Sequence, residues 1–118
     1  MRRRNAKNAH ERVQARDGLM VLDPSLYKGK WKDLFGNDNP IYLEIGMGKG
    51  KFIMQLAKEN PEINFVGIEK YSTVLLRAIQ KMEAEELPNL VFIRMDAEDL
   101  NEVFAKGEVD RIYLNFSD

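Results

Sequence analysis

Hydrophobic residues after position 40 fall into four short apolar runs, and the segments between them have helical spacing. The runs cover residues 41–45, 64–68, 90–93 and 111–116. Helices are predicted at about 51–59, 72–86 and 98–104. Strands that alternate with helices predict a parallel sheet with right-handed crossovers, and continuous apolar strands indicate burial on both faces.

Local signals support these boundaries. Asn60 precedes Pro61, and a residue before proline is pushed out of the α region, so the first helix should end there. Ser72 is a plausible N-cap for the second helix, and Pro88 follows its end. The turn cluster at 36–40 marks the start of the main fold.

The residues before this turn have a different character. Residues 1–18 are polar, and the short apolar segment 19–22 predicts either a small strand or a packing segment. Trp31 could stack on a nucleic-acid base. Because Leu34 and Phe35 follow it closely, we favour a packing anchor instead.

Composition places the chain among soluble globular proteins and excludes several kinds of site. It has 118 residues, 44% hydrophobic and 31% charged, enough for one small domain. It has no cysteine and one histidine, His10, which excludes a thiolate nucleophile and a sulfur-ligated or His-rich metal site. No apolar run approaches the roughly 20 residues that span a membrane, and the basic start leads into no apolar segment. We therefore expect a cytoplasmic protein with no membrane or metal partner.

The net charge of −1 conceals an asymmetry along the chain. Residues 1–32 hold nine basic and three acidic side chains, whereas residues 33–118 hold nine basic and sixteen acidic ones. A basic arm on an acidic domain indicates a polyanionic partner, and the alternative is a solvated terminus.

A glycine turn follows the first predicted strand. Glu44 precedes Gly46, Gly48 and Gly50, and glycine lets the backbone turn sharply and lets a ligand approach closely. A dinucleotide site needs glycine at the sixth position of this motif, where Lys51 stands, and the spacing is not that of a P-loop either. A carboxylate at Glu44 would repel a pyrophosphate but suits a cationic ligand such as S-adenosylmethionine.

Acidic residues end the other strands too. Glu69 follows the second strand and can accept both hydroxyls of a ribose, and Asp96 follows the third and can accept from an adenine amino group. Asp118 comes just after the fourth strand. Because the carboxyl ends of parallel strands share one edge of a sheet, we expect these acids and Glu44 to form one site.

These features resemble the class I S-adenosylmethionine-dependent methyltransferases, whose first motif is an acid followed by Gly-x-Gly-x-Gly. Within that superfamily the chain resembles the bacterial tRNA (guanine-N7)-methyltransferases. The matching segments are Lys30-Trp31 ahead of Phe35-Gly36-Asn37, then Gly67-Ile68-Glu69, and finally Tyr113-Leu114-Asn115-Phe116-Ser117-Asp118.

The resemblance implies an α/β, Rossmann-like class I methyltransferase fold with helices on both faces of a parallel sheet. Four strands are about half of such a domain, so we expect a basic arm and lead-in over 1–35 and the N-terminal half of the methyltransferase domain over 36–118. The implied cofactor is S-adenosylmethionine, and the implied partner is tRNA. The implied cofactor-binding residues are Glu44, Gly46, Gly48, Glu69, Asp96 and Asp118, and Asp118 is also the implied catalytic residue.

The implied reaction is methylation of guanine N7 in the variable loop of tRNA. Guanine N7 carries no proton, so the transfer needs no general base, and Asp118 would orient the purine through its N–H groups. One alternative role for Asp118 is to cap a following helix. Alternative functions are a class I methyltransferase with another substrate and a non-catalytic, Rossmann-like RNA-binding domain. A homodimer is left open.

Overall fold

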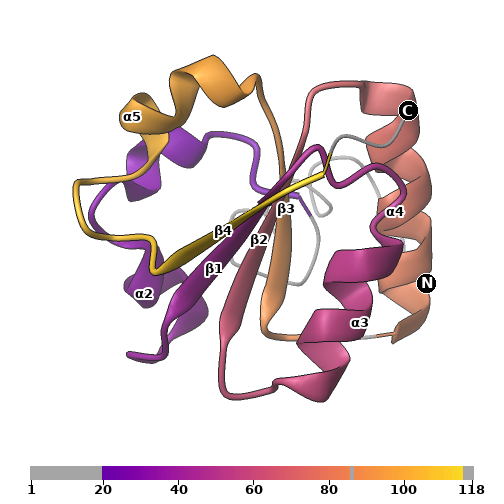
Figure 1. Ribbon diagram of the computed structural model, residues 1–118, viewed down its shortest axis with the longest axis horizontal. Helices are drawn as coiled ribbons and strands as arrows, with labels where there is room; N and C mark the ends of the chain where they lie inside the picture. Colours follow the sequence, from indigo (N-terminus) through magenta and orange to yellow (C-terminus); the bar gives the residue numbers. More distant parts are fainter. Residues whose placement is uncertain (1–19, 86, 116–118) are drawn as a thin grey trace.

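The computed structural model describes residues 20–85 and 87–115, apart from the side chains of residues 83 and 84. Figure 1 shows a central sheet between two layers of helices. In chain order the described elements are η1 (Pro24–Tyr27), α2 (Trp31–Phe35), β1 (Ile41–Ile45), α3 (Lys51–Glu59), β2 (Asn64–Glu69), α4 (Ser72–Glu85), β3 (Leu90–Arg94), η2 (Ala97–Asp99), α5 (Leu100–Val103) and β4 (Arg111–Leu114).

The four described strands are parallel and lie in the order β3-β2-β1-β4. Helices α3 and α4 cover one face of the sheet, and α2 and α5 cover the other (Figure 1). Alternate side chains of the inner strands supply the two cores: Val66 packs with Trp31 of α2, whereas Phe65 packs with Ile53 of α3. The predicted α/β architecture is therefore confirmed for the described residues.

The strand and helix boundaries agree closely with the sequence pattern. The strand over 41–45 and the helix over 51–59 are confirmed, and α4 is described as far as Glu85. The third predicted helix, over 98–104, is instead a 3-10 turn followed by the short helix α5. The carboxylate Oδ1 of Asp96 accepts a hydrogen bond from the backbone N–H of Glu98 at 3.0 Å, which caps this 3-10 turn.

The fourth strand differs from the burial that its apolar pattern predicts. Ile112 and Leu114 are 48% and 60% exposed, and among the described strands β4 pairs with β1 alone. An apolar run records hydrophobicity but not the position of a strand in the sheet. Phe116, in the predicted strand, lies outside the described residues.

The lead-in segment packs on both sides of the domain. The backbone N–H of Val21 donates to the carbonyl of Phe92 at 2.8 Å, so the segment joins the open edge of β3 by an isolated bridge. Trp31 is completely buried, and its Nε1–H donates to the carbonyl of Val103 at 2.8 Å. Its ring stacks on Phe104 with centroids 5.1 Å apart. The packing interpretation of Trp31 is confirmed.

One carboxylate ties this lead-in to the rest of the fold. Oε1 of Glu108 accepts from the N–H groups of Gly29 and Ala105, at 2.8 and 2.9 Å, and Oε2 accepts from the N–H of Trp31 at 3.0 Å. Charge-assisted bonds of this kind are about twice as strong as neutral ones. Glu108 therefore holds the start of α2 against the α5–β4 loop. Within the described residues, no helix combines the length and apolarity needed to cross a membrane.

Candidate functional site

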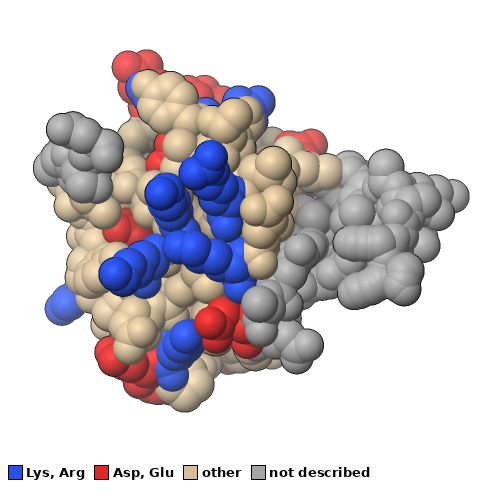
Figure 2. Space-filling view, turned by 90° about the vertical axis from the view of Figure 1, so that its right-hand side faces the viewer, with Lys and Arg blue, Asp and Glu red and all other residues tan. Residues whose placement is uncertain are grey.

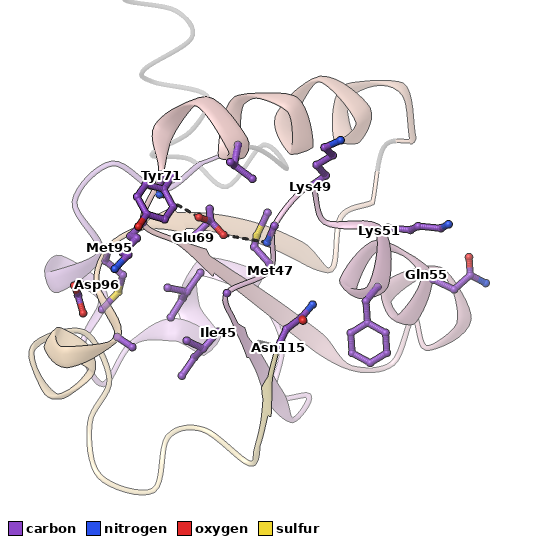
Figure 3. Close-up of a pocket in the computed structure, with 17 residues that line it drawn as sticks. Ile45, Met47, Lys49, Lys51, Gln55, Glu69, Tyr71, Met95, Asp96 and Asn115 are labelled. Atoms are coloured by element: carbon purple, nitrogen blue, oxygen red, sulfur yellow. Dashed lines mark hydrogen bonds between the residues drawn. The ribbon is translucent and has the colours of Figure 1, made fainter. Parts of the chain in front are cut away.

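A cavity of about 1220 Å³ opens at the carboxyl ends of β1, β2 and β3 (Figure 3). Its walls are the turns that follow these three strands, the start of α3 and the end of β4. The residues that line it are Ile45, Gly46, Met47, Gly48, Lys49, Lys51, Phe52, Gln55, Ile68, Glu69, Lys70, Tyr71, Val74, Met95, Asp96, Ala97 and Asn115. Open α/β sheets bind their ligands at this edge.

The glycine turn after β1 has backbone angles that favour glycine. The φ angles of Gly46, Gly48 and Gly50 are 75°, 59° and 81°, all left-handed. A Cβ on Gly46 would lie 2.7 Å from the carbonyl oxygen of Asn115, so this glycine allows β4 to end against the turn. A Cβ on Gly48 would meet nothing within 4 Å. Gly48 thus leaves backbone accessible from the cavity.

Glu69 connects the turns after β1 and β2. Its side chain is 7% exposed, Oε1 accepts from the N–H of Gly48 at 3.0 Å, and Oε2 accepts from the N–H of Tyr71 at 3.1 Å (Figure 3). A carboxylate has about four acceptor positions, so two backbone donors leave it able to accept further hydrogen bonds. Glu69 is therefore an oriented acceptor in the cavity wall.

Glu44 lies one layer behind this wall. Its side chain is completely buried, and Glu44 is not among the lining residues, whereas Asn115 is. The Nδ2–H of Asn115 donates to Oε2 of Glu44 at 3.2 Å, and Oε1 has no hydrogen-bond partner among the described residues. Burial raises the pKa of the Glu44 carboxyl from 4.5 to about 7, and the bond from Asn115 opposes this rise.

The structure brings most of the predicted site residues together. Gly46, Gly48, Glu69 and Asp96 all line the cavity. Asp96 is exposed, and the capping bond that it accepts from Glu98 fixes one of its oxygens at the end of β3. Asp118 lies outside the described residues, and its predicted role stays a prediction.

Sequence reasoning missed two residues in the cavity wall. Asn115 directly follows β4, much as Glu69 and Asp96 stand at or just after the ends of β2 and β3, and this shared position could have identified it from the sequence. Tyr71 follows Glu69 by two residues and is 60% exposed, and the ammonium of Lys70 lies 5.2 Å from its ring centroid. An exposed aromatic ring at a cavity offers a flat face for a planar ligand.

A family model matches the part of the chain that forms the sheet and the cavity. A family model described as "Putative methyltransferase" matches residues 38–118, which is more than half of the chain. The chain belongs to this methyltransferase family. The match includes all of the strands and the whole cavity wall described above.

Curated relatives narrow the resemblance. The chain is 58% identical over its whole length to a tRNA (guanine-N(7)-)-methyltransferase of Lachnoclostridium phytofermentans, of which it covers 55%. It is 48% identical over its whole length to a protein of the same name from Bacillus cytotoxicus, of which it covers 54%. The chain spans about half the length of these relatives. Their names confirm the resemblance predicted from the sequence.

Solved structures agree on the fold. An antibiotic-related methyltransferase aligns with a TM-score of 0.61 at 25% identity, over 76% of this chain and 47% of that protein. A 30S ribosomal A1408 methyltransferase from an uncultured bacterium aligns with a TM-score of 0.61 at 22% identity, over 75% of this chain and 43% of that protein. The PKMT2 protein of Rickettsia typhi, solved with AdoHcy, aligns with a TM-score of 0.56 at 23% identity, over 77% of this chain and 18% of that protein. The predicted class I methyltransferase fold is confirmed.

Proposed function

We propose that the chain forms the cofactor-binding part of an S-adenosylmethionine-dependent enzyme that methylates N7 of a guanine in the variable loop of tRNA. The observation that carries the proposal is the bond between Glu69 and the N–H of Gly48, which joins an oriented acceptor to an open glycine turn at one cavity. The names of the curated relatives support the choice of substrate.

The cavity wall suits S-adenosylmethionine. When bound, this cofactor supplies a methyl group on a positively charged sulfur. Glu69 would accept hydrogen bonds from the ribose hydroxyls, and Asp96 would accept one from the adenine amino group. The open backbone at Gly48, with no Cβ contact within 4 Å, leaves room for close approach at the turn, and Gly46 shapes that turn.

Glu44 acts from behind the wall. Its carboxylate is buried beside the turn and is bonded to Asn115, a lining residue. When ionised, it favours a cationic ligand in the cavity, because a buried charge is weakly screened. The proposed contribution of Glu44 is therefore electrostatic, with Asn115 as its link to the cavity surface.

The rest of the proposed mechanism is positioning. Guanine N7 is an unprotonated acceptor on the major-groove edge, so no residue of the chain has to remove a proton before transfer. Asp118 would accept hydrogen bonds from the N–H groups of the guanine and favour the positive charge that the purine gains. Asp118 is the proposed catalytic residue on the strength of the resemblance and of its place three residues after Asn115.

The decisive experiment is an assay for the position of the methyl group. The full-length protein is incubated with labelled S-adenosylmethionine and unmodified tRNA, and the product is tested for chain cleavage at 7-methylguanosine. We expect label in tRNA and cleavage at one position in the variable loop. Label on an exocyclic amine, or no transfer despite cofactor binding, would overturn the assignment.

A further inference from the structure

Basic side chains gather on the face of the molecule formed by α3 and α4. Figure 2 shows Lys and Arg at the centre of this face. Four exposed residues that flank the glycine turn or lie on α4 supply charge there, and we name them the α3–α4 basic cluster. They are Lys49, Lys51, Arg77 and Lys81.

Packing of the turn against α4 brings these residues together. A Cβ on Gly50 would lie 3.2 Å from the Cβ of Ala78, so the turn contacts the second turn of α4 directly. Lys49 and Lys51 flank Gly50, and Arg77 adjoins Ala78 in the chain. Arg77 and Lys81 are four residues apart on a helix, so they share one face. The cluster therefore extends from the cavity wall, which Lys49 and Lys51 line, along α4.

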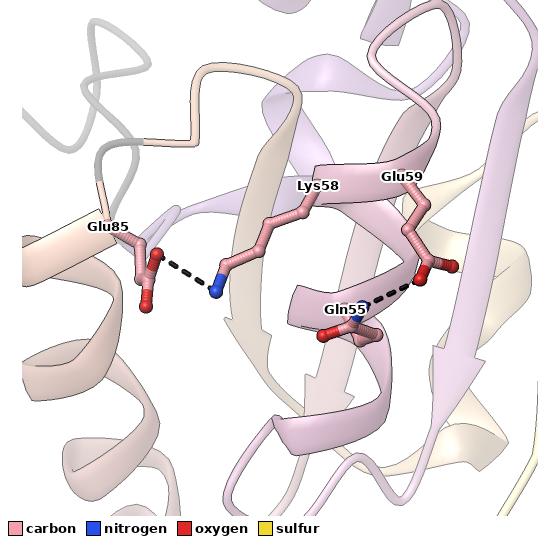
Figure 4. Close-up of polar contacts among 4 residues, drawn as sticks. All are labelled: Gln55, Lys58, Glu59 and Glu85. Carbon is pink, nitrogen blue, oxygen red and sulfur yellow. Dashed lines mark hydrogen bonds and ion pairs between the residues drawn. The ribbon is translucent and has the colours of Figure 1, made fainter.

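The cluster is not neutralised within the described part of the protein. None of its four side chains makes an ion pair or hydrogen bond with a described residue. By contrast, Lys58 near the end of α3 pairs with Glu85 at the end of α4, with Nζ and Oε1 3.0 Å apart (Figure 4). Nearby, Glu59 accepts from Gln55 at 2.7 Å (Figure 4). Lys49 and Lys51 thus lie at the cavity, whereas the acids that have partners on α3 and α4, Glu59 and Glu85, lie at the far ends of the two helices.

Two exposed aromatic rings accompany the positive charge. Phe52 and Tyr71 line the cavity and are 44% and 60% exposed, and each directly follows a lysine. Cations on a surface with exposed rings are typical of proteins that bind single-stranded or looped RNA, because cations contact phosphates and rings stack on bases. The cations alone would suffice to bind an acidic protein, whereas exposed rings beside them add stacking surfaces for bases.

We propose that the α3–α4 basic cluster binds phosphates of the tRNA on the α4 side of the cofactor cavity. The proposal rests on the proposed function and adds a contact surface to it. The cluster shares no residue with the basic arm at residues 1–16, which lies outside the described residues. Phosphate contacts carry most of the affinity of a protein for nucleic acid, and each one makes binding more sensitive to salt.

The test is the double variant Arg77→Gln/Lys81→Gln in the full-length protein. Neither residue lines the cavity, and glutamine keeps a good helix propensity. We expect the Kd for tRNA at about 0.1 M salt to rise on the order of tenfold, and the slope of log K against log salt to flatten by roughly 1 to 2. The affinity for S-adenosylmethionine, measured by calorimetry, should stay unchanged.

The matched control is Lys106→Gln/Arg111→Gln, which removes the same charge from two exposed side chains between α5 and the start of β4, neither of which lines the cavity. This control should bind tRNA like the wild-type protein. An equal loss in both double variants would mean a general charge effect and would overturn the proposal. Unchanged tRNA affinity in the cluster variant, with guanine N7 still methylated, would overturn the proposed phosphate-binding surface. The proposed function would then be retained. A wild-type protein that neither binds nor methylates tRNA would overturn both.

Discussion

The side-chain amide of Asn115 donates a hydrogen bond to the buried carboxylate of Glu44 at 3.2 Å, and this bond joins the end of β4 to the end of β1. The backbone N–H of Asn115 also donates to the carbonyl oxygen of Ile45 at 3.1 Å, which holds the same two strand ends together. Because Asn115 lines the cavity and Glu44 does not, the pair connects a buried carboxylate to the cavity wall.

The raised pKa of Glu44 makes stability depend on pH. The carboxyl has a pKa of about 7 in the folded chain and about 4.5 when unfolded, so between these values the folded state holds more protons. Stability should therefore fall as pH rises from about 5 to 7, by on the order of 3 kcal/mol for this group alone. Urea unfolding at pH 5 and pH 8 measures this change in the free energy of unfolding. Glu44→Gln should remove most of this dependence, whereas exposed Glu62→Gln should keep it, and equal slopes in both variants would contradict the assignment.

Glu69→Ala should weaken the binding of S-adenosylmethionine by about tenfold or more, because it removes the proposed ribose acceptor and the two backbone bonds that orient the turns. Calorimetry with the exposed control Glu62→Ala measures the effect. Glu69→Gln keeps one acceptor oxygen, so it should lose less affinity for S-adenosylmethionine than Glu69→Ala. Cofactor affinity that is unchanged in Glu69→Ala would refute the ribose role.

Two glycines of the turn should respond differently to alanine. Gly46→Ala combines a φ of 75° with a Cβ 2.7 Å from the carbonyl oxygen of Asn115, so it should lower the free energy of unfolding clearly more than Gly48→Ala. Gly48→Ala meets no atom within 4 Å, so its cost should stay near the roughly 1–2 kcal/mol of a left-handed residue. Its main effect should be weaker cofactor binding. Urea unfolding and calorimetry on both variants separate these effects, and similar unfolding losses would argue against the contact with Asn115.

Asp118→Ala should reduce the rate of methyl transfer far more than it weakens tRNA binding, because the proposed role of this carboxylate is to orient the guanine and stabilise its positive charge. Single-turnover rates and tRNA Kd values, measured beside exposed Asp33→Ala as control, provide the comparison. Losses of equal size in rate and affinity would indicate a binding role only.

Deletion of residues 1–16 removes six basic residues and one acid, and it should weaken tRNA binding and flatten its salt dependence. Binding measured between about 0.05 and 0.3 M salt tests this, with cofactor affinity as the check on folding. If neither the Kd nor the slope changes, the arm does not contact tRNA.

The predicted elements and most of the cavity wall follow from local patterns in the sequence. The strand over 41–45 and the helix over 51–59 were predictable because burial on a strand or helix repeats with the period of its backbone. Glu69 and Asp96 could be placed together because parallel strands end at the same edge of a sheet. The glycine turn was predictable because left-handed φ angles favour glycine.

Other features depend on residues that are far apart in the chain. The bond between Glu44 and Asn115 spans 71 residues, and Glu108 reaches Gly29 over 79. Within the described residues Ile112 and Leu114 are exposed on β4, which lies at one edge of the described sheet, and an apolar run does not record strand order. The sequence by itself determined the elements, the turn and the acids at the strand ends, because each is a local or periodic property. Only the tertiary structure decided which carboxylate faces the cavity and which lies behind it, because burial and hydrogen-bond partners depend on the packing of distant segments.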